Sequence, residues 1–107
     1  MAIIMYKLAF FVPETHIDQV KEAVFAAGAG RMGAYEACSW QVLGQGQFRP
    51  VVGATPFIGK QGTLEVVSEY RVEMLCDQEH IHAAIEALKN SHPYEEPAFE
   101  AWRLDLF

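Results

Sequence analysis

The segment HPYEEP (residues 92–97) places an imidazole just before the first of two prolines, and a phenol and two carboxylates between them. Imidazole and carboxylate groups together suit several divalent metal ions. His92 with Glu95 or Glu96 could supply two ligands, and a third would have to come from elsewhere in the chain or from a neighbouring subunit. The alternative is a structural connector, in which His92 satisfies groups at a helix end, Tyr94 packs and both glutamates are solvated.

Other reactive side chains make a weaker case for chemistry. His80 and His82 point to different sides of an expected helix, so they are poor joint metal ligands. Ser39 and Ser68 lie on expected strands, outside any nucleophile elbow of the G-x-S-x-G type. We find no serine or cysteine nucleophile with a histidine and an acid to complete a triad. We therefore expect a protein that is not an enzyme, with a divalent metal ion as the one candidate cofactor.

The stretch GAGRMG (residues 28–33) matches the pattern G-x-G-x-x-G. In dinucleotide-binding folds this pattern follows a strand and opens a helix, so that the helix N-terminus meets the pyrophosphate. Here it follows an expected helix and enters an expected strand, which reverses that context. We therefore interpret Gly30, Gly33 and the nearby Tyr35 as structural residues.

The connection 44–62 is the longest irregular stretch of the chain. It holds five of the eight glycines and two of the five prolines. Long connections in compact domains are usually functional or mobile. Arg49 and Lys60 could hold an anion, but the GKS or GKT ending of a P-loop is missing. We expect this connection to contact a neighbouring subunit or a small ligand.

Composition and charge narrow the class of protein. The 107 residues fit one domain, residues 1–107, and two cysteines are too few for a disulfide framework, so Cys38 and Cys76 are expected to be buried thiols. A net charge of −6 without a basic stripe argues against nucleic-acid binding. No stretch approaches the roughly 20 apolar residues of a membrane span, and the start lacks a secretory signal. We expect a cytoplasmic location, and the 51% hydrophobic fraction favours a buried subunit interface.

Alternating apolar residues predict four strands that position these groups. In residues 64–76 the even positions are mostly apolar and the odd positions carry charges, which indicates one buried face. Shorter strands are expected over residues 6–12, 37–42 and 99–106.

Two helices are expected between the strands. In residues 17–27 the apolar side chains recur at spacings of three and four, with Thr15 and Asp18 as a capping box. The second helix follows Asp77, a good N-cap, and must end by His92 because Pro93 disfavours helical geometry in the residue before it.

The resulting order, β-α-β-β-α-β, predicts a ferredoxin-like α+β fold with an antiparallel sheet and both helices on one face. The other sheet face would favour association with another subunit. We expect it to carry Ala9, Phe11, Val67 and Phe99.

An internal repeat supports two βαβ halves. A shift of 64 residues aligns residues 6–24 with 70–88 and GAYE (33–36) with PAFE (97–100). This register gives about seven identities over about 31 positions, where average composition gives roughly two. HPYEEP is then the counterpart of GAGRMG.

Three ordered motifs together resemble the YqfO, or Nif-three-like, family. They are GRMGAYEACSW (30–40), GQGQFRPVVGATPFIG (44–59) and HPYEEPAFE (92–100). The resemblance covers residues 6–106. More specifically, the chain resembles the inserted central domain of the longer bacterial members, as a stand-alone version of that domain. The resemblance implies a fold of the CutA/PII type. It also implies that the dinuclear metal site of full-length members lies in flanking lobes outside this chain, so neither those metals nor a hydrolase activity carries over.

The resemblance adds expectations about assembly. CutA-like proteins carry an HPY-type segment and form trimers, and PII proteins use the connection between strands two and three as a ligand-responsive loop. The leading hypothesis is a non-catalytic, homotrimeric regulatory or binding module with a small ligand or protein partner. In it Pro93, Tyr94 and Pro97 fix the start of the last strand. The alternative is a CutA-like protein that binds a divalent metal through His92 with Glu95 and Glu96.

Overall fold

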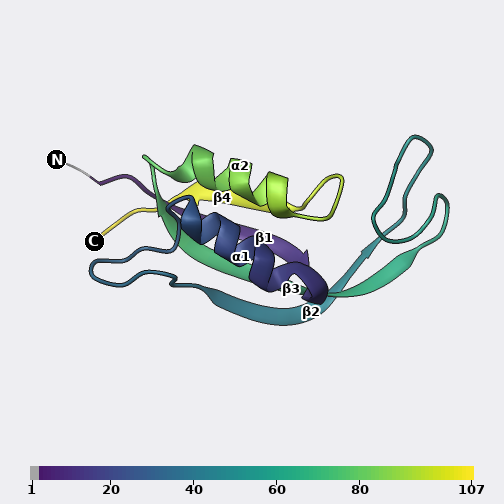
Figure 1. Cartoon of the computed structure of the whole chain (residues 1–107), viewed down its shortest axis with the longest axis horizontal. Helices are drawn as coiled ribbons and strands as arrows, with labels where there is room; N and C mark the ends of the chain where they lie inside the picture. The colour runs from purple at the N-terminus through teal and green to yellow at the C-terminus, as the bar shows by residue number, and fades with distance from the viewer. Residues whose placement is uncertain (1–2) are drawn as a thin grey trace.

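The structure is a computed structural model that describes residues 3–107. Four antiparallel strands form one sheet in the order β2-β3-β1-β4, and both helices lie on the same face of it (Figure 1). The predicted ferredoxin-like fold is confirmed. The elements are β1 (Met5–Pro13), a 3-10 turn η1 (Glu14–His16), α1 (Ile17–Ala26), β2 (Trp40–Phe48), β3 (Glu65–Asp77), α2 (Ile81–Ser91) and β4 (Phe99–Arg103).

The hydrophobic core lies between the sheet and the two helices. Alternate side chains of β1 and β3 point into it because a strand turns successive residues to opposite faces. These side chains meet the apolar stripes of α1 and α2. The largest fully buried side chains are those of Leu8, Phe10, Val12, Val20, Val24, Val72, Cys76 and Leu88.

The two cysteines are both free thiols. Cys76 is buried as expected, and burial, with the nearby Asp77 carboxylate as a second cause, raises the pKa of its thiol to about 11. Cys38 is only half-buried, so the expectation of a second buried thiol is wrong. Its Sγ lies 3.7 Å from the carbonyl oxygen of Glu36, in the connection that precedes β2.

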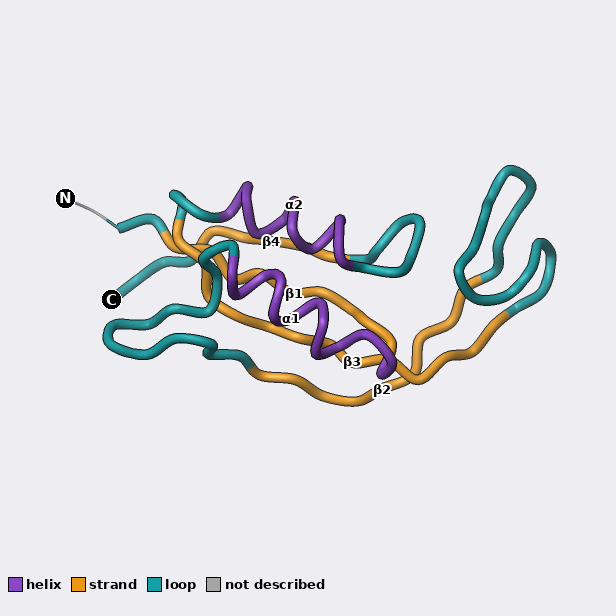
Figure 2. Tube along the Cα trace, viewed as in Figure 1, coloured by secondary structure: helices purple, strands orange, loops and turns teal. Residues whose placement is uncertain are grey.

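The bounds of β2 differ from the predicted strand 37–42. The strand begins at Trp40 and runs to Phe48, so the first five residues of the expected connection 44–62 are strand (Figure 2). Glycine has a low strand propensity, yet the paired β3 supplies a ladder for Gly44 and Gly46. The remaining connection is residues 49–64, which we call the arm. It extends from one end of the molecule, whose dimensions are 51 × 23 × 23 Å (Figure 1).

The helix starts confirm the internal repeat but not the capping box. The helices begin at Ile17 and Ile81, as the 64-residue shift requires. No side-chain hydrogen bond caps α1, and Thr15 Oγ1 instead lies 2.7 Å from His16 Nδ1. Asp77 acts one turn before α2, where its Oδ1 accepts the backbone N–H of His80 at 2.9 Å.

The strand register decides which residues share the sheet face opposite the helices, which we call the open face. Residues paired across antiparallel strands point to the same side. Ala9 pairs with Glu73 and Phe11 with Arg71, so these residues lie on the open face as expected. Phe99 pairs with the core residue Phe10 and therefore faces the helices, so its expected place on the open face is wrong.

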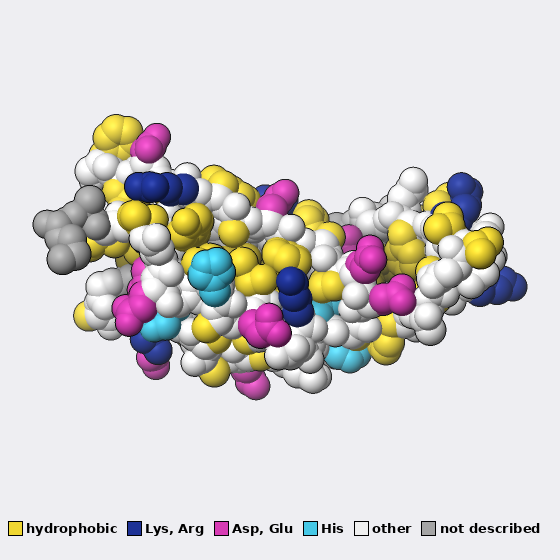
Figure 3. All heavy atoms as spheres, turned by 90° about the horizontal axis from the view of Figure 1, so that it is seen from above, with side chains coloured by type: hydrophobic (Ala, Val, Ile, Leu, Met, Phe, Trp, Pro, Cys, Tyr) yellow, Lys and Arg dark blue, Asp and Glu magenta, His cyan; other side chains and the backbone are white. Residues whose placement is uncertain are grey.

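Among the helices of residues 3–107, none is long and apolar enough to cross a membrane. Figure 3, a view from above Figure 1, shows acidic side chains near the base of the arm and basic ones at its far end.

Candidate functional site

The two segments that the sequence singles out, HPYEEP and the arm, meet around a cavity of about 320 Å³. The cavity lies at the end of the open face from which the arm extends. Its floor includes Phe11, Val67 and Glu69 of the sheet. Its other walls come from residues 47–58 and from Tyr94, Glu95 and Glu96. The structure thus brings together groups such as Thr55 and Glu95, which lie 40 residues apart in the chain.

Aromatic rings hold the arm against HPYEEP. The Phe57 ring centroid lies 5.4 Å from that of His16 and 6.4 Å from that of Tyr94. The Phe48 ring approaches Tyr94 to 6.2 Å. Thr55 adds a polar contact, because its backbone N–H donates to both carboxylate oxygens of Glu95 at 3.3 Å. Together these contacts fix the cavity walls.

His92 is buried, with 7% of its surface exposed, and both of its ring nitrogens are engaged. Nε2 donates to the carbonyl oxygen of Phe11 at 2.7 Å, and Nδ1 accepts the backbone N–H of Tyr94 at 3.1 Å. These partners define a neutral imidazole with its proton on Nε2. Burial lowers the pKa of His92, which favours the same neutral form. The side chain therefore joins HPYEEP to β1, instead of satisfying carbonyl groups at the end of α2.

The expected metal ligands are not gathered around one point. A metal ion at His92 would have to replace one of its two hydrogen bonds, and the Glu95 carboxylate already accepts from Thr55. Glu96 is exposed on the rim of the cavity. The metal site at His92, Glu95 and Glu96 stays a prediction.

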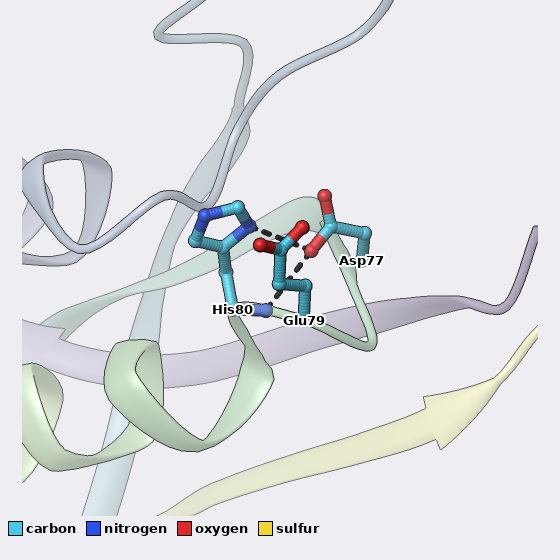
Figure 4. Close-up of side chains that lie close together, drawn as sticks. All are labelled: Asp77, Glu79 and His80. Atoms are coloured by element: carbon cyan, nitrogen blue, oxygen red, sulfur yellow. Dashed lines mark hydrogen bonds and ion pairs between the residues drawn. The ribbon is translucent and has the colours of Figure 1, made fainter.

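Within residues 3–107, the one group of three potential metal ligands whose atoms lie within 4.8 Å of one another is Asp77, Glu79 and His80 (Figure 4). Sequence reasoning weighed His80 only against His82 and missed this arrangement. Asp77 Oδ1 accepts from two of the three His80 nitrogens, the backbone N–H at 2.9 Å and Nδ1 at 2.7 Å. These hydrogen bonds close the turn between β3 and α2, which is a structural reason for the three residues to lie together.

The glycine-rich stretch 28–33 forms a turn before β2. Gly30 has a φ of +79°, its N–H donates to Leu75 at 2.7 Å and its carbonyl accepts from Cys38 at 2.8 Å. A Cβ at this position would lie 2.5 Å from the Phe25 ring. Met32 and Tyr35 close a small hairpin around Gly33, and Tyr35 is 76% exposed. α1 ends just before these glycines, and the His80 side chain at the start of α2 packs against Gly28.

Sequence reasoning also missed three residues of the cavity, namely Phe48, Phe57 and Glu69. Two aromatic residues within a glycine- and proline-rich stretch were a usable signal, since such side chains need a partner surface. Glu69 gave no signal of its own, because it is one of several charged residues on the alternating strand.

The fold is that of the CutA/PII type. Solved structures that share the architecture include CutA1 from Oryza sativa, with a TM-score of 0.70, 13% identity and coverage of 98% of this chain and 84% of that one. The Bacillus subtilis GlnK–ATP complex gives a TM-score of 0.61 and 9% identity, covering 95% of this chain and 84% of that one. At these identities the similarity concerns the fold alone.

Proteins of higher sequence identity give a more specific similarity. The chain is 47% identical over 100 residues to a GTP cyclohydrolase 1 type 2 homolog of Halalkalibacterium halodurans, covering 94% of this chain and 27% of that protein. The structure of a Bacillus cereus protein related to NIF3 gives a TM-score of 0.85 at 37% identity, covering 99% of this chain and 27% of that one. Over nearly its whole length the chain is therefore similar to one part of these Nif-three-like proteins, which confirms the resemblance to that family. It spans about a quarter of the length of these relatives, and no family model matches it.

Proposed function

We propose that this chain is a non-catalytic binding module that receives a small ligand in the cavity between the arm and HPYEEP. The observation that carries the proposal is the convergence of these two segments on one cavity with a fixed wall. Ligand sites are typically concave, mostly apolar and lined by a few polar groups, and this cavity has that character. A regulatory role in the cytoplasm belongs to the same proposal.

The arm could transmit the binding of a ligand to a partner protein or subunit. It is attached to HPYEEP through the Thr55–Glu95 hydrogen bonds and the ring contacts of Phe57. A ligand that displaced these contacts would change the position of the arm relative to the sheet. Its altered contacts with a partner would then report the ligand.

A screen of small neutral and charged fragments by two-dimensional ¹H–¹⁵N NMR tests the proposal. We expect fragments to shift the amide signals of Thr55, Tyr94 and Val67, which surround the cavity. Ala98→Phe fills part of the cavity and should abolish these shifts, whereas Ala101→Phe in β4, outside the cavity lining, should leave them unchanged. Shifts confined to other surfaces, or the absence of any shift, would contradict the proposed site.

We further propose that the module is a homo-oligomer, with a trimer favoured, assembled through the open face and β2. β2 is a nine-residue edge strand without a charged residue or a proline. Long unprotected edges of this kind pair readily with other strands. The same side of the sheet exposes Trp40 (57%), Val42 (45%) and Trp102 (40%). An apolar surface beside an open edge fits a second copy of the chain.

Size-exclusion chromatography with multi-angle light scattering tests the assembly at micromolar concentration. The wild type is expected to elute with the mass of several chains. Val42→Lys should shift the mass to that of one chain, because it places an ammonium group in the apolar contact. Ala83→Lys on the exposed side of α2 is the matched control and should leave the mass unchanged. A wild type that is strictly monomeric would refute the assembly.

A further inference from the structure

The cavity combines aromatic walls with an acidic lining, and this combination points to the chemistry of its ligand. Four aromatic side chains line it, namely Phe11, Phe48, Phe57 and Tyr94. Its charged lining residues are Arg49, Glu69, Glu95 and Glu96. Three carboxylates against one guanidinium leave two negative charges unmatched around the cavity.

The carboxylates of the cavity take no part in the ion pairs found among residues 3–107. Those ion pairs join Arg71 to Glu73 and Glu100, and His80 to Asp77. Glu95 has only the backbone N–H of Thr55 as a partner, at the long distance of 3.3 Å. The acidic lining is therefore open to a cation from outside the chain.

Glu69 is the half-buried carboxylate of the three. Its side chain lies over Gly46, in the space that a Cβ at that position would occupy. Burial raises the pKa of Glu69, and burial together with the charge of Glu69 raises the pKa of Tyr94. Both shifts show that negative charge is costly at this place in the absence of a positive partner.

Tyr94 provides an independent observation. Its hydroxyl oxygen is buried and has no hydrogen-bond partner among the described residues. Buried polar atoms are nearly always paired, so an orphan beside a ligand-sized cavity indicates a missing partner. An N–H donor bound next to Glu69 could satisfy the phenol oxygen and the carboxylate together.

We propose that the cavity binds a small organic cation, with an ammonium, amidinium or guanidinium group on a flat or apolar body. The positive group donates hydrogen bonds to Glu69 and Tyr94, and the apolar body packs against the rings of Phe48 and Phe57. Charge-assisted hydrogen bonds and cation–π contacts both strengthen when they are partly shielded from water. A carboxylate or phosphate would face the unmatched acidic groups instead. This inference rests on the proposed function, because it names the ligand class of the same cavity.

Three probes of nearly equal shape separate charge from fit, namely benzamidine, benzamide and benzoate. We titrate each into the full chain near pH 7.5 and follow the ¹H–¹⁵N signals around the cavity. Benzamidine is expected to bind at least about tenfold more tightly than benzamide, as charge-assisted hydrogen bonds imply, and benzoate is expected not to bind. ATP serves as a larger anionic probe.

Variants identify the groups responsible. Glu69→Gln should weaken benzamidine about tenfold while leaving benzamide unchanged, since it removes the charge and keeps the shape. Glu22→Gln makes the same change of net charge at an exposed position of α1 and should have no effect on benzamidine binding. If Glu69→Gln fails to fold, Glu95→Gln together with the dependence of benzamidine binding on ionic strength gives the same test.

The outcomes distinguish this inference from the function on which it rests. Preferred binding of benzoate or ATP in the cavity, or equal affinities for benzamidine and benzamide, would overturn the proposal that the ligand is a cation. Either result would still support the proposal that the cavity binds a small ligand. A benzamidine affinity that is the same in wild type and Glu69→Gln would also overturn the proposal of a cation. If none of the probes or screened fragments shifts the cavity signals, both proposals fail.

Discussion

Replacement of His92 by alanine is expected to lower the free energy of unfolding by about 3 kcal/mol. The change leaves the Phe11 carbonyl and the Tyr94 N–H without their partners, and a buried unpaired group costs about 1–3 kcal/mol. It also removes a ring that packs 4.9 Å from that of Tyr94. Urea denaturation followed by circular dichroism at pH 7.5 measures the difference.

His82→Ala is the matched control, since His82 is exposed on α2. A surface substitution of this kind should change stability by less than about 0.5 kcal/mol. Equal effects of the two variants would contradict the role assigned to His92.

The same residue makes stability depend on pH in a defined direction. Burial lowers the pKa of His92 below its ordinary value of 6.5, so the unfolded chain takes up a proton at a higher pH than the folded one. The contribution of the neutral imidazole is therefore full above pH 6.5 and is lost as the pH falls towards the folded pKa. In His92→Ala this part of the pH dependence should disappear.

His92→Ala also tests the metal hypothesis. If His92, Glu95 and Glu96 hold a divalent ion, calorimetric titration with Zn²⁺ should show uptake by the wild type that the folded variant lacks. Unchanged uptake would remove this site from consideration.

Phe10→Ala is expected to have the largest effect of any single change considered, a loss of about 3–5 kcal/mol. Phe10 is fully buried between the sheet and the helices and is the largest such side chain. Its removal leaves a cavity that the packed neighbours can fill only in part. Thermal and urea denaturation both report the loss.

Phe107→Ala provides the control of identical chemistry, because Phe107 is fully exposed at the end of the chain. It should alter the free energy of unfolding by less than about 0.5 kcal/mol. A loss below about 1 kcal/mol for Phe10→Ala would show that the core is not packed as described.

Local patterns in the chain predicted most of the fold. Apolar side chains alternate along the strand over residues 64–76 and recur every three or four residues in the two helices. These periods involve only neighbouring residues, so they can be recognised without coordinates. Glycine was the misleading signal. Gly44 and Gly46 suggested a loop, but the β3 partner strand makes them part of β2. Pairing between distant segments overrode local propensity there.

The candidate site was predicted in its parts but not in its arrangement. HPYEEP and the connection 44–62 were both recognised, since prolines, glycines and clustered polar groups stand out in the chain. Their meeting was not, because the Thr55–Glu95 contact joins residues 40 positions apart. The role of His92 was hidden for the same reason, as its partner Phe11 lies 81 positions away.

The sequence by itself determined the element order, the periods of the strands and helices, the repeat with its 64-residue shift and the family motifs. These depend on neighbours along the chain, or on direct comparison of residues. Only the tertiary structure decided that Phe99 faces the helices, that His92 is a buried neutral link to β1, and that HPYEEP forms a wall of a cavity. The physical reason is the strand register, since a shift of one residue exchanges the two faces of a sheet and with them every contact of the site.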